Sequence, residues 1–170
     1  MNKLITCVLC VCCALSAQAQ KFAYVDTEYI LGEIPEYVKA QEQINQLQSQ
    51  YQTAIEQEMQ KVDRMFRNYQ AEKGRLNENQ RQQREQEIIT AEQTAKDLQK
   101  SYFGQEGTLS QRANALITPI REKVQTAIDA VAKEGNYAII FDLAANPGII
   151  YTQEQLNLSG AVLRKLQIIK

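Results

Sequence analysis

Residues 44–69 read INQLQSQYQTAIEQEMQKVDRMFRNY, and this stretch decides the fold. Its apolar side chains recur every three or four residues among Gln, Glu, Lys and Arg, and they are Ile44, Leu47, Tyr51, Ile55, Met59, Val62, Phe66 and Tyr69. This spacing is typical of one face of an α-helix. Pro35 suits the first position of such a helix. We therefore predict a helix over residues 35–72, about 55 Å long at 1.5 Å per residue.

A second apolar stripe follows, made of Ile88, Ala91, Ala95, Leu98, Tyr102, Leu109, Ala113, Leu116, Ile120, Val124, Ala127 and Val131. Between the stripes, residues 73–79 read KGRLNEN, with Gly and Asn suited to ending one helix and capping the next. We predict that the second helix runs over about residues 79–133, kinked by Pro119, and folds back on the first as an antiparallel hairpin.

Two short segments flank the helices. FAYVD at residues 22–26 is a strand candidate, followed by a brief helix over residues 27–31. YAIIFD at residues 137–142 is apolar and β-prone, and the turn-like residues 144–148 separate it from IIY at residues 149–151. This pattern predicts a β-hairpin. Asn157 or Ser159 is then expected to cap a closing amphipathic helix.

The first 19 residues have the layout of a secretory signal peptide: Lys3, an apolar run over residues 4–15, and AQA at residues 17–19. The run is too short to span a bilayer stably. We expect cleavage after Ala19 and an exported mature chain. The alternative is a lipidated Cys12 or Cys13, but the small residues expected before such a cysteine are missing.

Composition excludes several classes of function. The chain has no His, and all four Cys lie within the first 13 residues. After cleavage, disulfides, thiolate nucleophiles, Cys or His metal sites and histidine relays are therefore excluded. Asp26, Glu28 and Asp142 follow no spacing that specifies a catalytic or metal site. We predict no enzyme, no metal and no cofactor, and the weakly acidic chain carries no recognisable nucleic-acid module.

The predicted fold is α+β and mostly α, a long helical-hairpin arm over residues 35–118, with its tip at residues 73–79, on a small β body. The body combines residues 20–34 and 119–170. So small a body has a marginal core, and its short strands leave exposed edges. We therefore expect oligomerisation to complete it. The apolar body residues are Phe22, Tyr24, Val25, Ile139, Ile140, Phe141, Ile149, Ile150 and Tyr151.

The order of these elements resembles the Skp/OmpH family of periplasmic chaperones. The resemblance is carried by AYVD at residues 23–26, YAIIFD at residues 137–142, and IY at residues 150–151 before LNLS at residues 156–159. Family members usually have Asp and Thr where this chain has Asn157 and Ser159. The resemblance implies a homotrimer in the periplasm of a Gram-negative bacterium. Its three hairpins enclose a cavity that holds unfolded outer-membrane proteins without ATP.

Six arm side chains are candidates for client contact: Met59, Met65, Phe66, Tyr69, Tyr102 and Phe103. Methionine and aromatic side chains adapt to many partner sequences. A second interpretation is that Phe66, Tyr69 and Tyr102 only join the two helices. Met65 and Phe103 each lie one position off the stripe, which makes them the better candidates for facing a cavity.

The predicted tip is basic, although the whole chain has 19 basic and 20 acidic residues. Its cationic residues are Lys61, Arg64, Arg67, Lys73, Arg75, Arg81 and Arg84. They either steer acidic chains and anionic headgroups or form a solvated helix end. The resemblance also implies peripheral contact with an anionic membrane or lipopolysaccharide, but this near-neutral chain supports no specific lipopolysaccharide site.

Gly104 and Gly107 interrupt good helix propensity at about 1 kcal/mol each. They either form a hinge or make room for a neighbour such as Tyr51, and Pro119 is a third hinge candidate. The main alternative to a chaperone is a structural coiled-coil spacer or adaptor of the envelope. The glycine pair favours a flexible cage over a rigid spacer.

Overall fold

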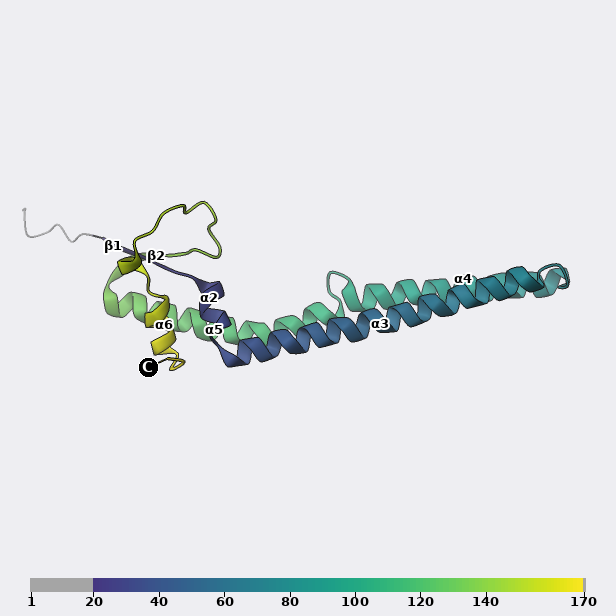
Figure 1. Ribbon diagram of the computed structural model, residues 1–170, viewed down its shortest axis with the longest axis horizontal. Helices are drawn as coiled ribbons and strands as arrows, with labels where there is room; N and C mark the ends of the chain where they lie inside the picture. Colours follow the sequence, from purple (N-terminus) through teal and green to yellow (C-terminus); the bar gives the residue numbers. More distant parts are fainter. Residues whose placement is uncertain (1–19, 170) are drawn as a thin grey trace, which may run out of the picture. The chain divides into compact units, whose positions relative to one another are not determined.

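The computed structural model describes residues 20–169. Its elements are β1 (Lys21–Val25), α2 (Thr27–Gly32), α3 (Pro35–Glu72), α4 (Glu78–Phe103), α5 (Thr108–Gly135), β2 (Tyr137–Asp142), η1 (Glu154–Leu156) and α6 (Ser159–Lys165), and all but η1 are labelled in Figure 1. The chain divides into two compact units. We call Pro35–Arg121 the arm unit, and the residues before Pro35 together with those from Glu122 onward the body unit. The predicted signal peptide and the lipidation alternative lie outside the described residues.

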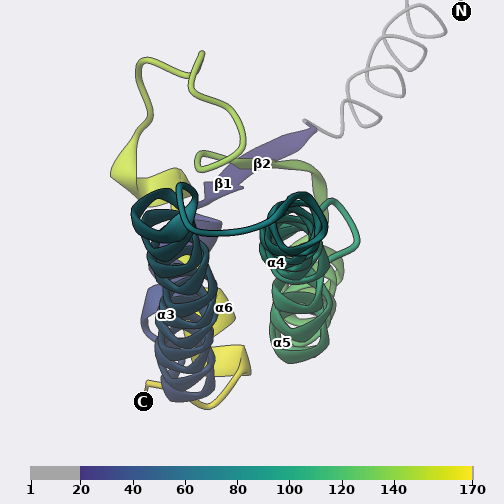
Figure 2. The ribbon, with the colours of Figure 1, turned by 90° about the vertical axis from the view of Figure 1, so that its right-hand side faces the viewer.

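The arm unit contains the predicted long antiparallel hairpin. Helix α3 begins at Pro35 and ends at Glu72, as the sequence predicted. It lies side by side with α4, and a short connection joins the two helices, as Figures 1 and 2 both show. Asn77 caps α4 because its side chain accepts from the Gln80 amide, while the Gln80 side chain accepts from the Asn77 amide, at 2.9 and 3.0 Å.

The prediction of one continuous second helix is wrong. Helix α4 ends at Phe103 and α5 begins at Thr108, and the residues between them form a turn that includes Gly104 and Gly107. The glycines therefore end a helix instead of weakening its interior. Helix α5 continues through Pro119 to Gly135.

The predicted hairpin of residues 137–142 with residues 149–151 is also wrong. Strand β2 pairs with β1, and the two strands are parallel, with Phe22 opposite Ile139 and Tyr24 opposite Phe141. Residues 149–151 belong to no strand. A parallel pair needs a long crossover connection, and here the arm lies within that connection.

Hydrogen bonds at the strand ends extend the parallel pairing. The Leu143 amide donates to the Val25 carbonyl at 2.9 Å, which extends the pairing beyond β2. The Asp142 carboxylate accepts from the Thr27 amide at 3.1 Å and from its hydroxyl at 2.7 Å. These bonds fasten the end of β2 to the start of α2.

The core of the body unit is small and closed. Its most buried side chains are Val25, Ile30, Val162, Leu163 and Ser159. Ser159 is polar, and its hydroxyl accepts from the Asp26 amide at 2.9 Å, so its burial leaves that oxygen satisfied.

The start of α6 differs from the prediction. Its N-cap residue is Leu158, which makes no side-chain cap, and Ser159 is the first helical residue. Asn157 accepts from the Ser159 amide at 3.0 Å, so it supports the turn before the helix. Ser159 is unavailable as a cap because its hydroxyl already bonds to the β1–α2 connection.

Candidate functional site

The seam between α3 and α4 is the line of side chains buried where the two helices meet. Its most buried members are Ile55, Val62, Tyr69, Ile88 and Ala95. Near the tip, Val62, Tyr69 and Ile88 form a cluster against which Met65, Leu76 and Ala91 pack. The seam is therefore narrow and leaves most of each helix surface exposed.

Two residues that the sequence placed on the apolar stripe lie outside the seam. The side chains of Met59 and Phe66 are 54% and 51% exposed. The half-buried residue at this point of the seam is Glu58 and not Met59. Seven residues further on, it is Met65 and not Phe66. The apolar pattern therefore misplaced this part of the seam by one residue. Met65 is half-buried there, although the sequence placed it one position off the stripe.

Exposed apolar side chains mark the surface of the hairpin. Met59 and Phe66 are seven residues apart, so they share one face of α3. On α4, Ile89 is 56% exposed and Phe103 is 38% exposed. The sequence analysis missed Ile89, although adjacent isoleucines at residues 88 and 89 point about 100° apart on a helix and cannot both enter a narrow seam.

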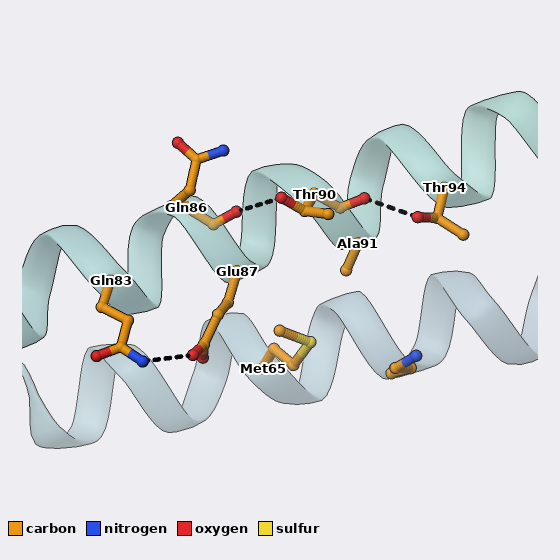
Figure 3. Close-up of a pocket in the computed structure, with 8 residues that line it drawn as sticks. Met65, Gln83, Gln86, Glu87, Thr90, Ala91 and Thr94 are labelled. Atoms are coloured by element: carbon orange, nitrogen blue, oxygen red, sulfur yellow. Dashed lines mark hydrogen bonds between the residues drawn. The ribbon is translucent and has the colours of Figure 1, made fainter.

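An open groove of about 570 Å³ follows one side of the seam. Its lining residues are Lys61, Met65, Gln83, Gln86, Glu87, Thr90, Ala91 and Thr94. Figure 3 shows Met65 of α3 and Ala91 of α4 extending into the space between the helices. The Thr90 and Thr94 hydroxyls donate to carbonyls one helical turn earlier, at 2.8 and 2.9 Å. The groove thus offers methyl, thioether and amide groups beside the charged Lys61 and Glu87, a set suited to weak contacts with varied chains.

An aromatic cluster joins the helices beside the turn. The rings of Tyr51 and Tyr102 stack with centroids 4.1 Å apart, and the ring of Phe103 meets Tyr51 edge-on at 6.5 Å. Tyr102 is half-buried in this cluster, as the helix-joining interpretation expected. Phe103 contributes to the cluster and keeps part of its ring at the surface.

Tyr69 closes the tip of the hairpin and does not face outward, since it is only 4% exposed. Its hydroxyl donates to the Glu85 carboxylate, and this hydrogen bond, followed by burial, raises the pKa of Tyr69. The Lys73 ammonium lies 5.5 Å from the Tyr69 ring centroid. Arg81 Nε donates to the Lys73 carbonyl at 3.1 Å, so side chains from both sides of the connection hold it in place.

Ion pairs neutralise part of the basic tip. Lys61, Arg81 and Arg84 pair with Glu58, Glu78 and Glu87 at 3.3, 3.9 and 2.9 Å. Within residues 20–169, no ion pair forms at the remaining four cations, Arg64, Arg67, Lys73 and Arg75. The unpaired positive charge is therefore smaller than the sequence suggested.

A second exposed apolar surface lies on the body unit. Phe22, Ile139 and Phe141 are 45%, 47% and 42% exposed, and Ile150 and Tyr151 are 97% and 77% exposed. The other predicted body residues, Tyr24, Val25, Ile140 and Ile149, are buried or half-buried. In the described chain, β2 has a strand neighbour on one side only.

The acidic residues near the strand ends have structural roles. Asp26 accepts from the Tyr29 amide at 3.0 Å and caps α2, and Asp142 holds Thr27. Residues 20–169 contain no cluster of His, Cys, Asp or Glu suited to a metal ion. In the same range, no helix combines the length and the apolar character needed to cross a membrane.

Comparison with known proteins confirms the resemblance. A family model described as outer membrane protein (OmpH-like) matches residues 21–166. No curated protein matches the chain. A crystal structure described as a candidate OmpH-like outer membrane chaperone from Caulobacter crescentus CB15 has a TM-score of 0.69 at 9% identity, over 89% of this chain and 86% of that chain. At that identity the likeness shows the fold alone. Because the family model spans nearly all the described residues, this chain belongs to the OmpH-like family of outer membrane proteins.

Proposed function

We propose that this protein is an ATP-independent holding chaperone, which binds unfolded outer-membrane proteins in the periplasm and prevents their aggregation before membrane insertion. The observation that carries this proposal is the apolar surface on the hairpin. Met59 and Phe66 on α3, and Ile89 and Phe103 on α4, are each more than a third exposed on helices otherwise rich in Gln, Glu, Lys and Arg. Large exposed apolar side chains of this kind mark interaction surfaces.

The contacts with a client would be weak individually. Each exposed apolar side chain contributes about 1 kcal/mol when a client covers it. Several such contacts on linked arms raise the overall affinity through effective concentration, without one tight site. Methionine at residues 59 and 65, in particular, adapts to clients of different sequence.

The body unit would supply the linkage between arms. Exposed Phe22, Ile139 and Phe141, together with the unpaired edge of β2, favour association with further copies of the same chain. The family resemblance supports a homotrimer as that assembly. The exposed segment with Ile150 and Tyr151 is a further surface that association would cover.

The unpaired cations at the tip would act on the rate of encounter. Arg64, Arg67, Lys73 and Arg75 lie near the connection between α3 and α4, where a client or an anionic headgroup first meets the arm. Positive charge at such a site steers acidic partners and is screened by salt. Peripheral contact with an anionic membrane or lipopolysaccharide is part of this proposal.

The direct test is suppression of aggregation. The purified protein is added in a few-fold excess to a urea-unfolded outer-membrane β-barrel, which is then diluted, and light scattering is followed. We expect suppression by the wild type. The double variant Met59→Gln/Phe66→Gln loses about 2 kcal/mol of contact per arm and needs at least about tenfold more protein for the same suppression.

Gln50→Ser/Gln57→Ser is the matched control, because these exposed α3 residues are also seven positions apart. It should suppress aggregation as the wild type does. A wild-type protein that never suppresses aggregation would contradict the proposed function and favour an envelope spacer. Equal suppression by both double variants would show that the apolar pair on α3 is not the binding surface.

A further inference from the structure

The turn between α4 and α5 removes length from the second helix of the arm. In a continuous helix, Thr108 would lie about 10 Å along the axis from Ser101. Instead, the Thr108 hydroxyl donates to the Ser101 carbonyl at 3.3 Å. The Gly107 amide donates to the Gly104 carbonyl at 2.8 Å and closes the turn. Helix α5 therefore starts beside the end of α4, with the intervening residues looped out.

Both glycines are required by the looped-out form and not by a helix. A Cβ at Gly107 would lie 2.5 Å from the Tyr102 carbonyl oxygen and 2.9 Å from the Gly104 nitrogen. A Cβ at Gly104 would overlap the Lys100 carbonyl oxygen. Neither glycine has a positive φ, so glycine is needed here only because other backbone atoms lie where a Cβ would be. In a helix, alanine at each position would be favoured over glycine by about 1 kcal/mol.

Helical hydrogen bonds reach both ends of the turn. Gly104 has a helical φ of −63° and leaves the helix through its ψ of 171°. Its amide still donates to the Lys100 carbonyl at 2.8 Å, and the Gln111 amide donates to the Gly107 carbonyl at 3.1 Å. Helical hydrogen bonding thus continues up to both sides of the turn, and only the residues between would have to rearrange.

We propose that Gly104–Gly107 is a length-storing joint, which rewinds into helix and thereby changes the curvature of the arm. Rewinding these residues into helix adds about 6 Å to one side of the hairpin, while α3 opposite stays unchanged. Glu85 and Arg81 on α4 are fastened to Tyr69 and Lys73 across the tip, so α4 cannot slide freely past α3. The added length is taken up by bending.

The joint is a property of the arm, and its use in adapting to clients of different size rests on the proposed function. The Tyr51–Tyr102 stack holds the helices together directly before the turn. Bending would therefore be concentrated on the side of this stack that faces α5. Residues nearer the tip would keep the seam described above.

The experiment measures the length of the second helix across the turn. Exposed Lys96 and Asn114 are changed to Cys and spin-labelled, since the chain has no Cys beyond residue 13. In a continuous helix the two sites are about 27 Å apart, and the looped-out form brings them closer. We expect a mainly short distance in the wild type and a shift to about 27 Å in Gly104→Ala/Gly107→Ala. Gln105→Ala, in the same turn, is the control and keeps the short distance.

A second measurement adds a urea-unfolded eight-stranded outer-membrane barrel to the labelled wild type. A gain in the population near 27 Å supports the joint. The joint is overturned if the short distance persists in the double alanine variant, or if a broad distribution of distances replaces it. It is also overturned if the wild-type distance never lengthens with the barrel bound. Binding of the barrel is scored separately by light scattering. If the protein fails to suppress scattering, but the label distance still lengthens in Gly104→Ala/Gly107→Ala, the proposed function is contradicted and the joint is not.

Discussion

The arm unit and the body unit bury their apolar side chains in different ways. In the arm, α3 and α4 meet along a narrow seam, and large apolar residues such as Phe66 remain half-exposed beside it. In the body, Val25, Ile30, Val162 and Leu163 are at most 1% exposed and form a closed core. Side-chain hydrogen bonds from Asp142 and Ser159 join the elements around that core.

A long seam and a small core place different requirements on the sequence. A seam between two long helices needs only one apolar position in three or four, so the outer faces are free to carry Gln, charge and exposed apolar groups. A small core has no such freedom, because each of its few side chains contacts several elements. Residues on the outer faces of the arm can therefore change with little effect on stability, while the body constrains nearly every residue it buries.

The largest expected effect comes from truncating one side chain in each unit. Leu163→Ala in the body should lower the free energy of unfolding by about 4 kcal/mol, since Leu163 is fully buried and leaves a cavity. Ile55→Ala in the arm should cost about 2 kcal/mol, because the seam borders solvent and can collapse. Urea unfolding monitored by circular dichroism gives both values. Hydrogen exchange shows in which unit each loss of stability occurs. Equal losses for the two variants would contradict the contrast between core and seam.

A smaller effect is expected at the strand ends. Asp142→Ala leaves the Thr27 amide and hydroxyl without their acceptor and should cost about 2 kcal/mol. Asp142→Asn retains one acceptor oxygen and should cost about half as much. Thermal unfolding of the three proteins provides the comparison. If alanine and asparagine are equally harmless, the hydrogen bonds do not fasten β2 to α2.

The smallest effect is expected at the tip, where Tyr69→Phe removes the hydroxyl that bonds to Glu85. Because the pKa of Tyr69 is raised in the folded protein, the hydroxyl stabilises the tip fully below the ordinary tyrosine pKa of about 10. That contribution is lost as the pH rises through the raised value. We expect the wild type to be more stable than the variant between pH 7 and 9, and the two to converge above pH 10.

Paired urea titrations at each pH give the difference directly. Tyr102→Phe is the matched control, since that tyrosine also packs across the seam. If the difference in the free energy of unfolding between wild type and Tyr69→Phe grows above pH 10, this hydrogen bond is not its cause. Such a result would assign the stability of the tip to the Lys73 contact instead.

Features with strong local signals were predictable from the sequence. Pro35 marked the start of α3, and glycine and asparagine near residues 74 and 77 marked the connection, because the physics of helix ends is local. The choice of β2's partner was not predictable in this way. Residues 144–148 do form turns, with the Asn146 amide donating to the Leu143 carbonyl at 3.2 Å, but a turn does not specify that its flanks pair.

The surface of the candidate site was predicted in part. Phe103 is exposed, as its position off the stripe suggested. Met59 and Phe66 were placed on the stripe but are exposed, because the half-buried Glu58 and Met65 occupy the neighbouring seam positions. Apolar periodicity cannot register a seam position held by a charged residue. Likewise, two glycines signal a weak helix, but only the approach of carbonyl oxygens showed that the chain loops out.

The parallel pairing of β1 with β2 also bears on the order of folding. Ala23 and Ile140 are partners in the sheet, although the whole arm separates them along the chain. Closing so long a loop in an unfolded chain is entropically unfavourable and slow. Once α3 and α4 have zipped together from their short connection, most of that loop is already ordered, and the free chain left to close is short. The arm is thus the first element with reason to fold, and the smaller unit becomes complete only after its two halves have been made on either side of the arm.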